Sequence, residues 1–245
     1  MSSNPKSDQP TGKSQDGWVS RNLNRPISRA ITRQLLKFPV SPIAWTVAIT
    51  PLPIAGALLF LRGEYWSSLV AALLYQLYSI LDGCDGEIAR AKGLESESGR
   101  RLDMWCDTAA NILLVLSVGI GLSRYGAIFY LFEGIAAALL ILANEGWLAA
   151  RVVTASASAS DPLKQATYPR HRELIEHSGL LHFGGRFACF LVQIAKRDVA
   201  ILFFVLLAAI NQVAWIVHLL CGTAIVTLAL AVTASRRRGR TVTTR

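Results

Sequence analysis

The sequence has few cysteines, and they form neither a redox pair nor a zinc-binding pattern. None of the four cysteines belongs to a Cys-x-x-Cys motif, and His171, His177 and His182 follow no metal-ligand spacing. Zinc sites and disulfide frameworks depend on such spacing, so we expect neither here. We interpret Cys84 and Cys106 as small packing residues, and we expect the cysteines to be thiols.

Three further absences exclude other classes of protein. Residues 1–16 are rich in Ser, Lys, Gln and Asp and have no apolar core, which predicts a disordered tail and not a secretory signal. The net charge is +9, but no nucleic-acid-reading motif accompanies it, so we expect no nucleic-acid partner. This charge suits loops that lie near anionic lipid headgroups. The sequence also has no internal repeat, which argues against a transporter.

Long apolar segments, in contrast, are abundant. Hydrophobic residues make up 52% of the 245 positions, and the mean hydropathy is +0.39. These values exceed those of most soluble domains, and the segments predict an all-α integral membrane protein with six transmembrane helices. The six predicted spans are about 43–62, 66–83, 103–122, 126–150, 198–212 and 213–234. Asn211 and Gln212 are the one indication of a turn between the last two spans.

A separate helix is predicted before the first span. Between Trp18 and Phe38, apolar residues recur at near-helical spacing opposite a row of arginines. This pattern predicts an amphipathic helix over 17–39 that lies in the membrane interface, packs against the protein's own spans, or does both. A six-helix domain over 40–235 and a basic tail over 236–245 complete the predicted organisation.

The positions of Lys and Arg predict the orientation in the membrane. Basic residues crowd the leader, the loops after the second and fourth spans, and the tail, whereas the other side has only Arg62 and Arg124. Cytoplasmic loops carry an excess of Lys and Arg. We therefore expect both termini on the cytoplasmic side, in the inner or plasma membrane of a prokaryote.

A group of acidic residues lies where the second predicted span meets the third. Asp82 and Asp85 are three positions apart, and Asp103 and Asp107 are four apart, so each pair would share one face of a helix. If the loop 91–98 turns the chain back, the two pairs face each other at the cytoplasmic surface. Carboxylates that converge in this way repel one another unless divalent cations lie among them.

Oxygen ligands of this kind suit Mg²⁺ or Mn²⁺. Two such ions could clamp a phosphoryl group and its leaving oxygen. Gly86 would let a bulky substrate approach the backbone, and the guanidinium of Arg90 could bind phosphate oxygens.

These positions resemble the signature of the CDP-alcohol phosphotransferase (CDP-alcohol phosphatidyltransferase) family, D-x2-D-G-x2-A-R-x8-G-x3-D-x3-D. Every fixed position is filled, from Asp82 to Asp107. The resemblance implies that Asp82, Asp85 and Asp103 bind metal, and that Asp107 is both a metal ligand and the general base. It also implies a homodimer.

The same resemblance implies residues that bind the CDP-linked donor. Gly86 and Arg90 match the positions that contact the CDP moiety in the family. A serine of the connecting loop often helps to hold the donor's phosphates, and either Ser96 or Ser98 could do so here.

A weaker resemblance lies before the first span. The family often has a Ser/Thr-Pro-Asn turn followed by a threonine, and this chain has Ser41 and Pro42, then Ile43 in place of the asparagine, and Thr46. Ser41 and Pro42 are therefore candidates for donor binding through the backbone. Alternatively, the serine caps a helix and the proline occupies its first turn.

The acceptor side is less defined. Basic residues gather over 170–197, and Lys196 and Arg197 are the best candidates for binding a phosphorylated acceptor. Alternatively, these basic residues are cytoplasmic charges that face lipid headgroups. Glu133 and Glu145 lie within the fourth span, and either a site role or pairing with polar neighbours such as Asn111 or Gln76 would account for them.

Together these features predict a metal-dependent enzyme of phospholipid biosynthesis. The resemblance implies transfer of a phosphatidyl group from CDP-diacylglycerol to a polar alcohol, such as inositol phosphate or glycerol phosphate, with release of CMP. The alternatives are transfer from CDP-choline or CDP-ethanolamine to a lipid alcohol, and a transporter or membrane scaffold without activity. A polyprenyl transferase is disfavoured, because its D-D-x-x-D pattern is absent.

Overall fold

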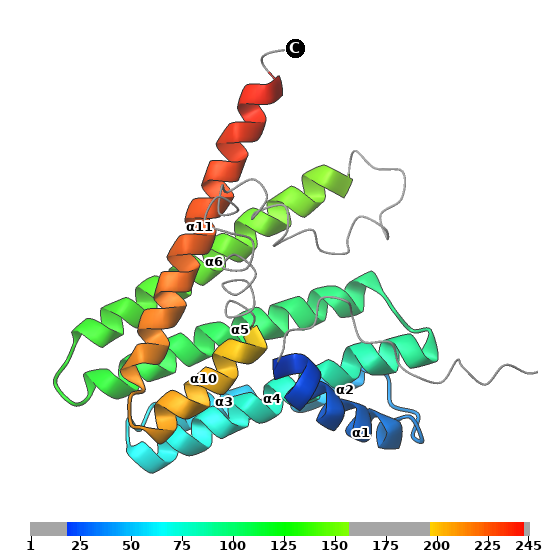
Figure 1. Cartoon of the computed structure of the whole chain (residues 1–245), viewed down its shortest axis with the longest axis horizontal. Coiled ribbons are helices and arrows are strands. Elements are labelled where there is room, and N and C mark those ends of the chain that lie inside the picture. Colours follow the sequence, from blue (N-terminus) through cyan, green and yellow to red (C-terminus); the bar gives the residue numbers. More distant parts are fainter. Residues whose placement is uncertain (1–18, 157–196, 243–245) are drawn as a thin grey trace, which may run out of the picture.

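The computed structural model describes residues 19–156 and 197–242, which form helices joined by short turns (Figure 1). The first element of the described residues is a π-helical turn, η1 (Ser20–Asn24), that continues directly into the first α-helix. The helices are α1 (Arg25–Leu35), α2 (Pro42–Ile49), α3 (Pro51–Phe60), α4 (Tyr65–Lys92), α5 (Glu97–Ser123), α6 (Phe129–Ser156), α10 (Arg197–Ala209) and α11 (Ala214–Val242). The predicted tail over 1–16 lies outside the described residues.

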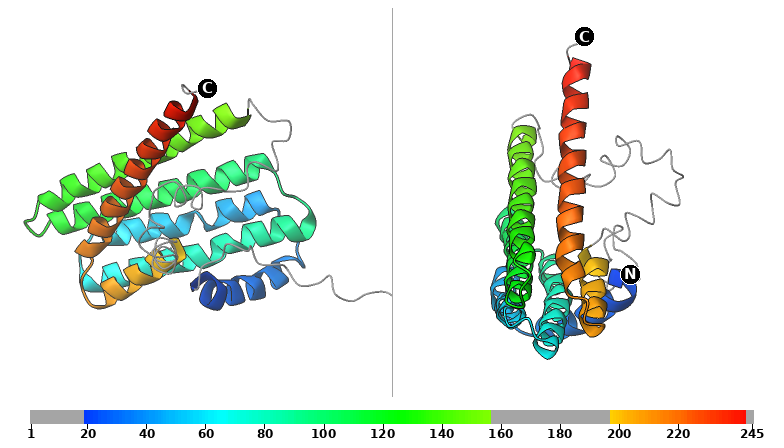
Figure 2. Two further views of the ribbon diagram at one scale, coloured as in Figure 1. Left: turned by 45° about the horizontal axis from the view of Figure 1, so that its top comes forward. Right: turned by 90° about the vertical axis from the view of Figure 1, so that its left-hand side faces the viewer.

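α4 is the central helix of the molecule. It packs against α1, α2, α3 and α10, while α5 packs against α2, α3, α6 and α11 (Figure 2). The largest apolar cluster draws side chains from α2, α3, α4, α5, α10 and α11, and Phe60, Tyr75, Leu114 and Ile216 are buried in it. The hydroxyl of Tyr75 also donates to the carbonyl of Ala110 at 3.1 Å, which ties α4 to α5.

Glycines allow the backbones of α5 and its neighbours to approach closely. A Cβ atom at Gly134 of α6 would lie 2.7 Å from the carbonyl oxygen of Val115. A Cβ at Gly121 of α5 would lie 2.1 Å from the carbonyl oxygen of Phe60. Neither oxygen can move without its helix, so only glycine fits at these crossings. Small residues of this kind are typical of contacts between membrane helices.

Three segments of the described chain are long and apolar enough to cross a membrane: Pro42–Phe60, Glu97–Ser123 and Phe129–Gly146. They overlap the first, third and fourth predicted spans. Asp198–Ala209 and Ala214–Ala229 are shorter apolar helices, and the turn between them contains Asn211 at φ 58°. The six-span arrangement therefore stays a prediction.

α4 overlaps the second predicted span, but it is not among the three segments of the described chain that are apolar enough to cross a membrane. Ser68, Gln76 and Ser79 lower its hydropathy, and all three side chains are buried among the other helices. The helix also continues nine residues past the predicted end at 83, to Lys92. The first part of the acidic motif, from Asp82 to Arg90, therefore lies on one continuous helix.

α1 packs on α4 through polar residues and leaves apolar residues outside. Asn24, Ser28 and Thr32 are buried, whereas Leu23 and Ile27 are about two-fifths exposed. The predicted packing against the protein's own helices is thus present. The exposed apolar side is what an interfacial helix would turn toward lipid.

α6 and α11 pack against each other and extend beyond the remaining helices (Figures 1 and 2). Nδ1 of His218 lies 2.6 Å from Oε1 of Glu133, and Nδ2 of Asn144 donates to the carbonyl of Ala224 at 3.0 Å. Glu133 therefore pairs with a histidine of the last helix, and not with the Asn111 or Gln76 expected from the sequence.

Candidate active site

The turn between α4 and α5 reverses the chain, as the acidic motif requires. Gly93 ends α4 at φ 64°, a left-handed conformation that glycine adopts without steric cost, and the N–H of Leu94 donates to the carbonyl of Ala89 at 2.9 Å. Ser96 then begins α5, where its Oγ accepts from the N–H of Gly99 at 3.1 Å. The two halves of the motif therefore lie on adjacent helix ends.

Three of the four motif aspartates converge. Asp82 and Asp85 project from α4 and Asp103 from α5, and one carboxylate oxygen from each lies within 4.8 Å of the others. All three side chains are half-buried. An all-carboxylate group of this size fits a hard divalent cation such as Mg²⁺ or Mn²⁺. The predicted convergence of the two helix faces is confirmed.

Asp107 lies one helical turn beyond Asp103 on α5, and Tyr78 of α4 reaches it. The Tyr78 hydroxyl donates to Oδ1 of Asp107 at 3.2 Å. This contact orients the carboxylate between the two helices. Tyr78 lies four residues before Asp82, outside the motif, and the sequence pattern gave it no role.

Two hydrogen bonds hold the carboxylate of Asp85. Oγ1 of Thr46 donates to its Oδ2 at 2.8 Å, and the N–H of Gly86 donates to its Oδ1. Asp85 lies past the apolar part of α4, and burial, together with the nearby charge of Asp82, raises its pKa to about 6. A divalent cation would offset both effects, because it stabilises the ionised carboxylates.

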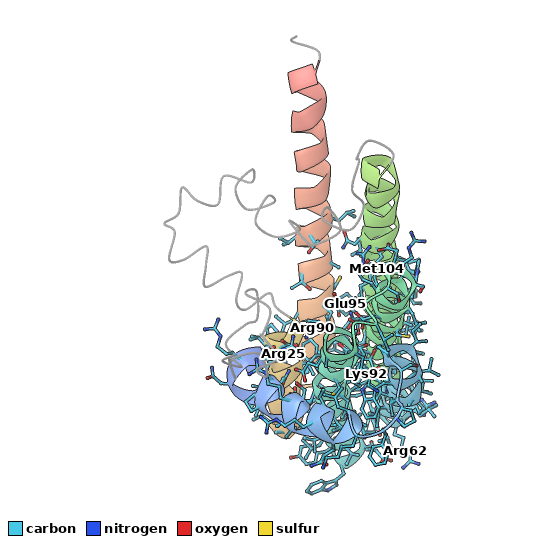
Figure 3. All side chains as sticks on the ribbon, turned by 90° about the vertical axis from the view of Figure 1, so that its right-hand side faces the viewer. Arg25, Arg62, Arg90, Lys92, Glu95 and Met104 are labelled. Carbon is cyan, nitrogen blue, oxygen red and sulfur yellow. The ribbon has the colours of Figure 1, made fainter. Side chains whose placement is uncertain are left out.

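Arg90 and Gly86 lie together on the next turn of α4. A Cβ at Gly86 would be 3.3 Å from Nη1 of Arg90, so the absence of a side chain leaves room for the guanidinium. Nε of Arg90 is buried and has no hydrogen-bond partner among the described residues. Figure 3 looks onto this end of the molecule and labels Arg90, with Lys92 and Glu95 nearby. The arrangement leaves an arginine donor available to an anionic ligand.

The candidate serines and proline lie at the starts of α2 and α5. Ser41 accepts from the N–H of Ala44 at 3.1 Å, and Pro42 occupies the first position of α2. Ser96 caps α5, and Ser98 in the first turn of that helix donates to Oγ of Ser96 at 3.3 Å. The capping interpretation of Ser41 is confirmed, and donor binding by any of these residues stays a prediction.

Glu87 was not singled out from the sequence, and it is the most buried acid of the motif. Its side chain is 2% exposed and accepts from Nη1 of Arg25 at 3.0 Å, from Oγ of Ser28 at 2.9 Å, and from Oγ1 of Thr32 at 2.8 Å. All three donors belong to α1. The signal available in the sequence was the row of small polar residues along one side of that helix.

Of the two acceptor candidates, only the backbone of Arg197 belongs to the described residues. Lys196 lies outside the described residues, and Arg197 begins α10, although its side chain is not described. The next residue, Asp198, reaches α4, where Oγ of Ser79 donates to its Oδ1 at 3.4 Å. The start of α10 is therefore close to the acidic motif, as expected for Lys196 and Arg197.

Comparison with known proteins agrees with these features. The family model described as CDP-alcohol phosphatidyltransferase matches residues 41–169, which include the whole acidic motif. A bifunctional IPC transferase and DIPP synthase of Rubrobacter xylanophilus is 39% identical over 126 residues, covering 51% of this chain and 28% of that protein. The Thermococcus kodakarensis protein of the same name is 46% identical over 92 residues, covering 38% and 20%. The matched region thus spans about a quarter or less of these relatives.

The fold is also similar to a solved structure. The apo crystal structure of phosphatidylinositol phosphate synthase from Mycobacterium tuberculosis superimposes with a TM-score of 0.52. The match covers 83% of this chain and 93% of that chain, at 18% sequence identity. At this identity the likeness concerns the arrangement of the helices alone.

Proposed function

Because the chain belongs to the CDP-alcohol phosphatidyltransferase family, we propose that it transfers a phosphatidyl group from CDP-diacylglycerol to a hydroxyl of a polar alcohol. CMP is the other product. The family consists of transferases, so the finer proposal concerns the donor, the acceptor and the residues that act on them.

One observation carries this proposal: Asp82, Asp85 and Asp103 come together from two helices, one or two turns from a buried arginine donor. A purely structural group of acids would gain nothing from converging, since like charges repel. A phosphoryl-transfer site needs such a group, because its work consists mostly of positioning the phosphates and stabilising charge on them.

The three aspartates fit a divalent cation through their ligand chemistry and the raised pKa of Asp85. We propose that they hold Mg²⁺ or Mn²⁺, with Asp107 as a further ligand and two ions in the complete site. When bound, such ions neutralise charge on the pyrophosphate and on the departing CMP.

The protein's own residues then divide the remaining work. Asp107, oriented by Tyr78, accepts the proton of the acceptor hydroxyl. The resulting oxygen attacks the phosphorus attached to diacylglycerol, and the bond between that phosphate and CMP breaks. Arg90 binds the phosphate oxygens through its available donor, and Gly86 leaves the space that it needs. Four further residues at the starts of α2 and α5 are proposed to contact the donor: Ser41, Pro42, Ser96 and Ser98.

For the acceptor we propose a polyol phosphate such as inositol phosphate or glycerol phosphate, with Lys196 and Arg197 binding its phosphate. A second candidate follows from the relatives, because their name, bifunctional IPC transferase and DIPP synthase, specifies no phosphatidyl product. A donor other than CDP-diacylglycerol is therefore the alternative. We also propose a homodimer, with both termini and the site on the cytoplasmic side.

The test is release of CMP from purified protein with each donor and acceptor. CDP-diacylglycerol, CDP-choline and CDP-ethanolamine would be combined with inositol phosphate, glycerol phosphate, inositol and serine, with and without Mg²⁺ or Mn²⁺. We expect acceptor-dependent CMP release from CDP-diacylglycerol that chelation abolishes.

Asp107→Asn isolates the chemical step. We expect this variant to lose about 10²-fold or more in turnover while its affinity for the donor changes little, because general-base catalysis supplies an effect of that size. Normal turnover by Asp107→Asn would show that another group takes the proton. CMP release that persists after chelation would contradict the role of the acid cluster.

A further inference from the structure

A small polar pocket lies beside the acid cluster, between α1, α4 and α10. Its wall includes Ser20, Asn24, Arg25, Ser79, Asp82 and Asp198. Asp82 also belongs to the group that could hold a cation. A molecule in this pocket would therefore lie directly beside the place where phosphoryl transfer is proposed.

Asn24 carries an incomplete set of hydrogen bonds in the pocket wall. Its side chain is 4% exposed, and its Oδ1 accepts from Nε2 of Gln76 at 3.0 Å. Its Nδ2 is buried and has no hydrogen-bond partner among the described residues. Buried amide donors are nearly always satisfied in folded proteins, so an exception inside a polar pocket indicates a ligand that supplies the acceptor.

The charges of the pocket indicate what kind of ligand it takes. Nη1 of Arg25 is bonded to the carboxylate of Glu87, which offsets its positive charge. Among the described residues, the other charged groups of the wall are the carboxylates of Asp82 and Asp198, and the hydroxyl of Ser79 donates to Asp198. Carboxylates repel a phosphate but accept hydrogen bonds from hydroxyl groups. This wall therefore suits the neutral, hydroxyl-bearing part of a molecule.

We infer that this pocket, here named the α1 pocket, binds the hydroxyl groups of the acceptor alcohol. Nδ2 of Asn24 donates to one hydroxyl oxygen, and the carboxylates accept from hydroxyl protons. Asn24 is then a specificity-determining residue supplied by the helical segment that precedes the spans. The inference rests on the proposed function and concerns the acceptor's polyol part, whereas its phosphate was assigned to Lys196 and Arg197.

The test compares Asn24→Ala with wild type in CMP release from CDP-diacylglycerol, with Mn²⁺ and with inositol phosphate, inositol or glycerol phosphate as the varied acceptor. Loss of one hydrogen bond predicts a rise of about tenfold in the acceptor KM. The donor KM and the Mn²⁺ concentration for half-maximal rate should not change. Gln34→Ala is the matched control, because Gln34 is an exposed amide on α1 that lies outside the pocket wall. It should leave all three quantities unchanged.

Ser79→Ala provides an independent variant if Asn24→Ala does not fold, since the Ser79 hydroxyl holds Asp198 in the wall. Its acceptor KM should also rise selectively. An acceptor KM that stays at the wild-type value in the folded variants would overturn the inference. So would an equal rise in the donor KM, which would indicate damage to the whole site. Absence of CMP release from wild type with every donor and acceptor would instead refute the proposed function.

Discussion

At the residue scale, the acid cluster depends on neighbours that carry no charge. Thr46 donates to Asp85 from α2, and Tyr78 donates to Asp107 from α4. Such partners orient a metal-binding carboxylate and tune its affinity. The sequence identified the four aspartates by their spacing, and it included Thr46 only as part of a weak resemblance. The partners could not be assigned because each contact joins residues 39 or 29 positions apart.

Thr46→Val tests the orienting contact. Valine keeps the shape of threonine but removes the hydroxyl, so Asp85 loses a donor at 2.8 Å. We expect metal affinity to fall about tenfold. Titration of the purified protein with Mn²⁺, followed by electron paramagnetic resonance, measures this directly.

Thr46→Ser is the matched control, since it keeps the hydroxyl and should bind Mn²⁺ as wild type does. Equal affinities of the valine and serine variants would show that the hydroxyl does not orient the ligand.

At the scale of elements, α1 is attached to α4 through one buried carboxylate. Glu87 accepts from three side chains of α1, and η1, which continues into α1, contributes Asn24 to the pocket beside Asp82. The amphipathic pattern predicted a helix in this region, and a helix is present, whereas its position in the membrane interface stays a prediction. The pattern did not show that the small polar side would be the one buried against α4.

Glu87→Ala should release α1 from α4. The change leaves the guanidinium of Arg25, whose side chain is 14% exposed, without the carboxylate that it faces. We expect a loss of about 3 kcal/mol in the free energy of unfolding. Trypsin should then cleave faster at Arg29 and Arg33.

Glu97→Ala is the control for this experiment. Glu97 also pairs with arginines, but its side chain is 45% exposed, and exposed pairs contribute little. It should leave cleavage within α1 unchanged. Identical cleavage rates for both variants would mean that Glu87 does not hold the helix.

The crossing of α5 and α6 provides a second test at this scale. Gly134→Ala places a Cβ 2.7 Å from the carbonyl oxygen of Val115, and the backbones must separate to accept it. We expect a destabilisation of about 2 kcal/mol, seen as a lower midpoint of thermal unfolding in detergent.

Gly146→Ala on the same helix is the control, because a Cβ there meets no atom within 4 Å. Alanine favours helix over glycine, so this variant should be at least as stable as wild type. A Gly134→Ala protein with an unchanged midpoint would show that the helices separate without cost.

At the scale of the whole molecule, the outer surface is apolar and the charges concentrate at one end. Leu58, Leu73 and Leu139 are half-exposed or more, as expected for helices that face lipid. Arg90, Lys92 and Glu95 lie where α4 leads into α5, whereas Arg62 lies in the turn between α3 and α4, at the other end of α4. This separation agrees with the asymmetry of basic residues in the sequence.

Labelling of single cysteines tests the orientation. In a background without native cysteines, Arg62→Cys should react with a membrane-impermeant maleimide on intact cells. Glu95→Cys should react only after the membrane is opened, because basic loops stay in the cytoplasm. Both positions are exposed, so access to the reagent depends on the side of the membrane. Labelling of Glu95→Cys on intact cells would reverse the proposed orientation.

The sequence by itself determined the helical class, the apolar segments and the acidic motif, because these follow from local composition and from fixed spacing along one chain. The spacing placed Asp82, Asp85, Asp103 and Asp107 on facing helix ends, and the first three converge in the structure. Only the tertiary structure decided which residues surround them. Glu87 meets Ser28 across 59 positions, and Asn24 meets Gln76 across 52. Contacts at such separations depend on how whole helices pack, and no local pattern encodes them.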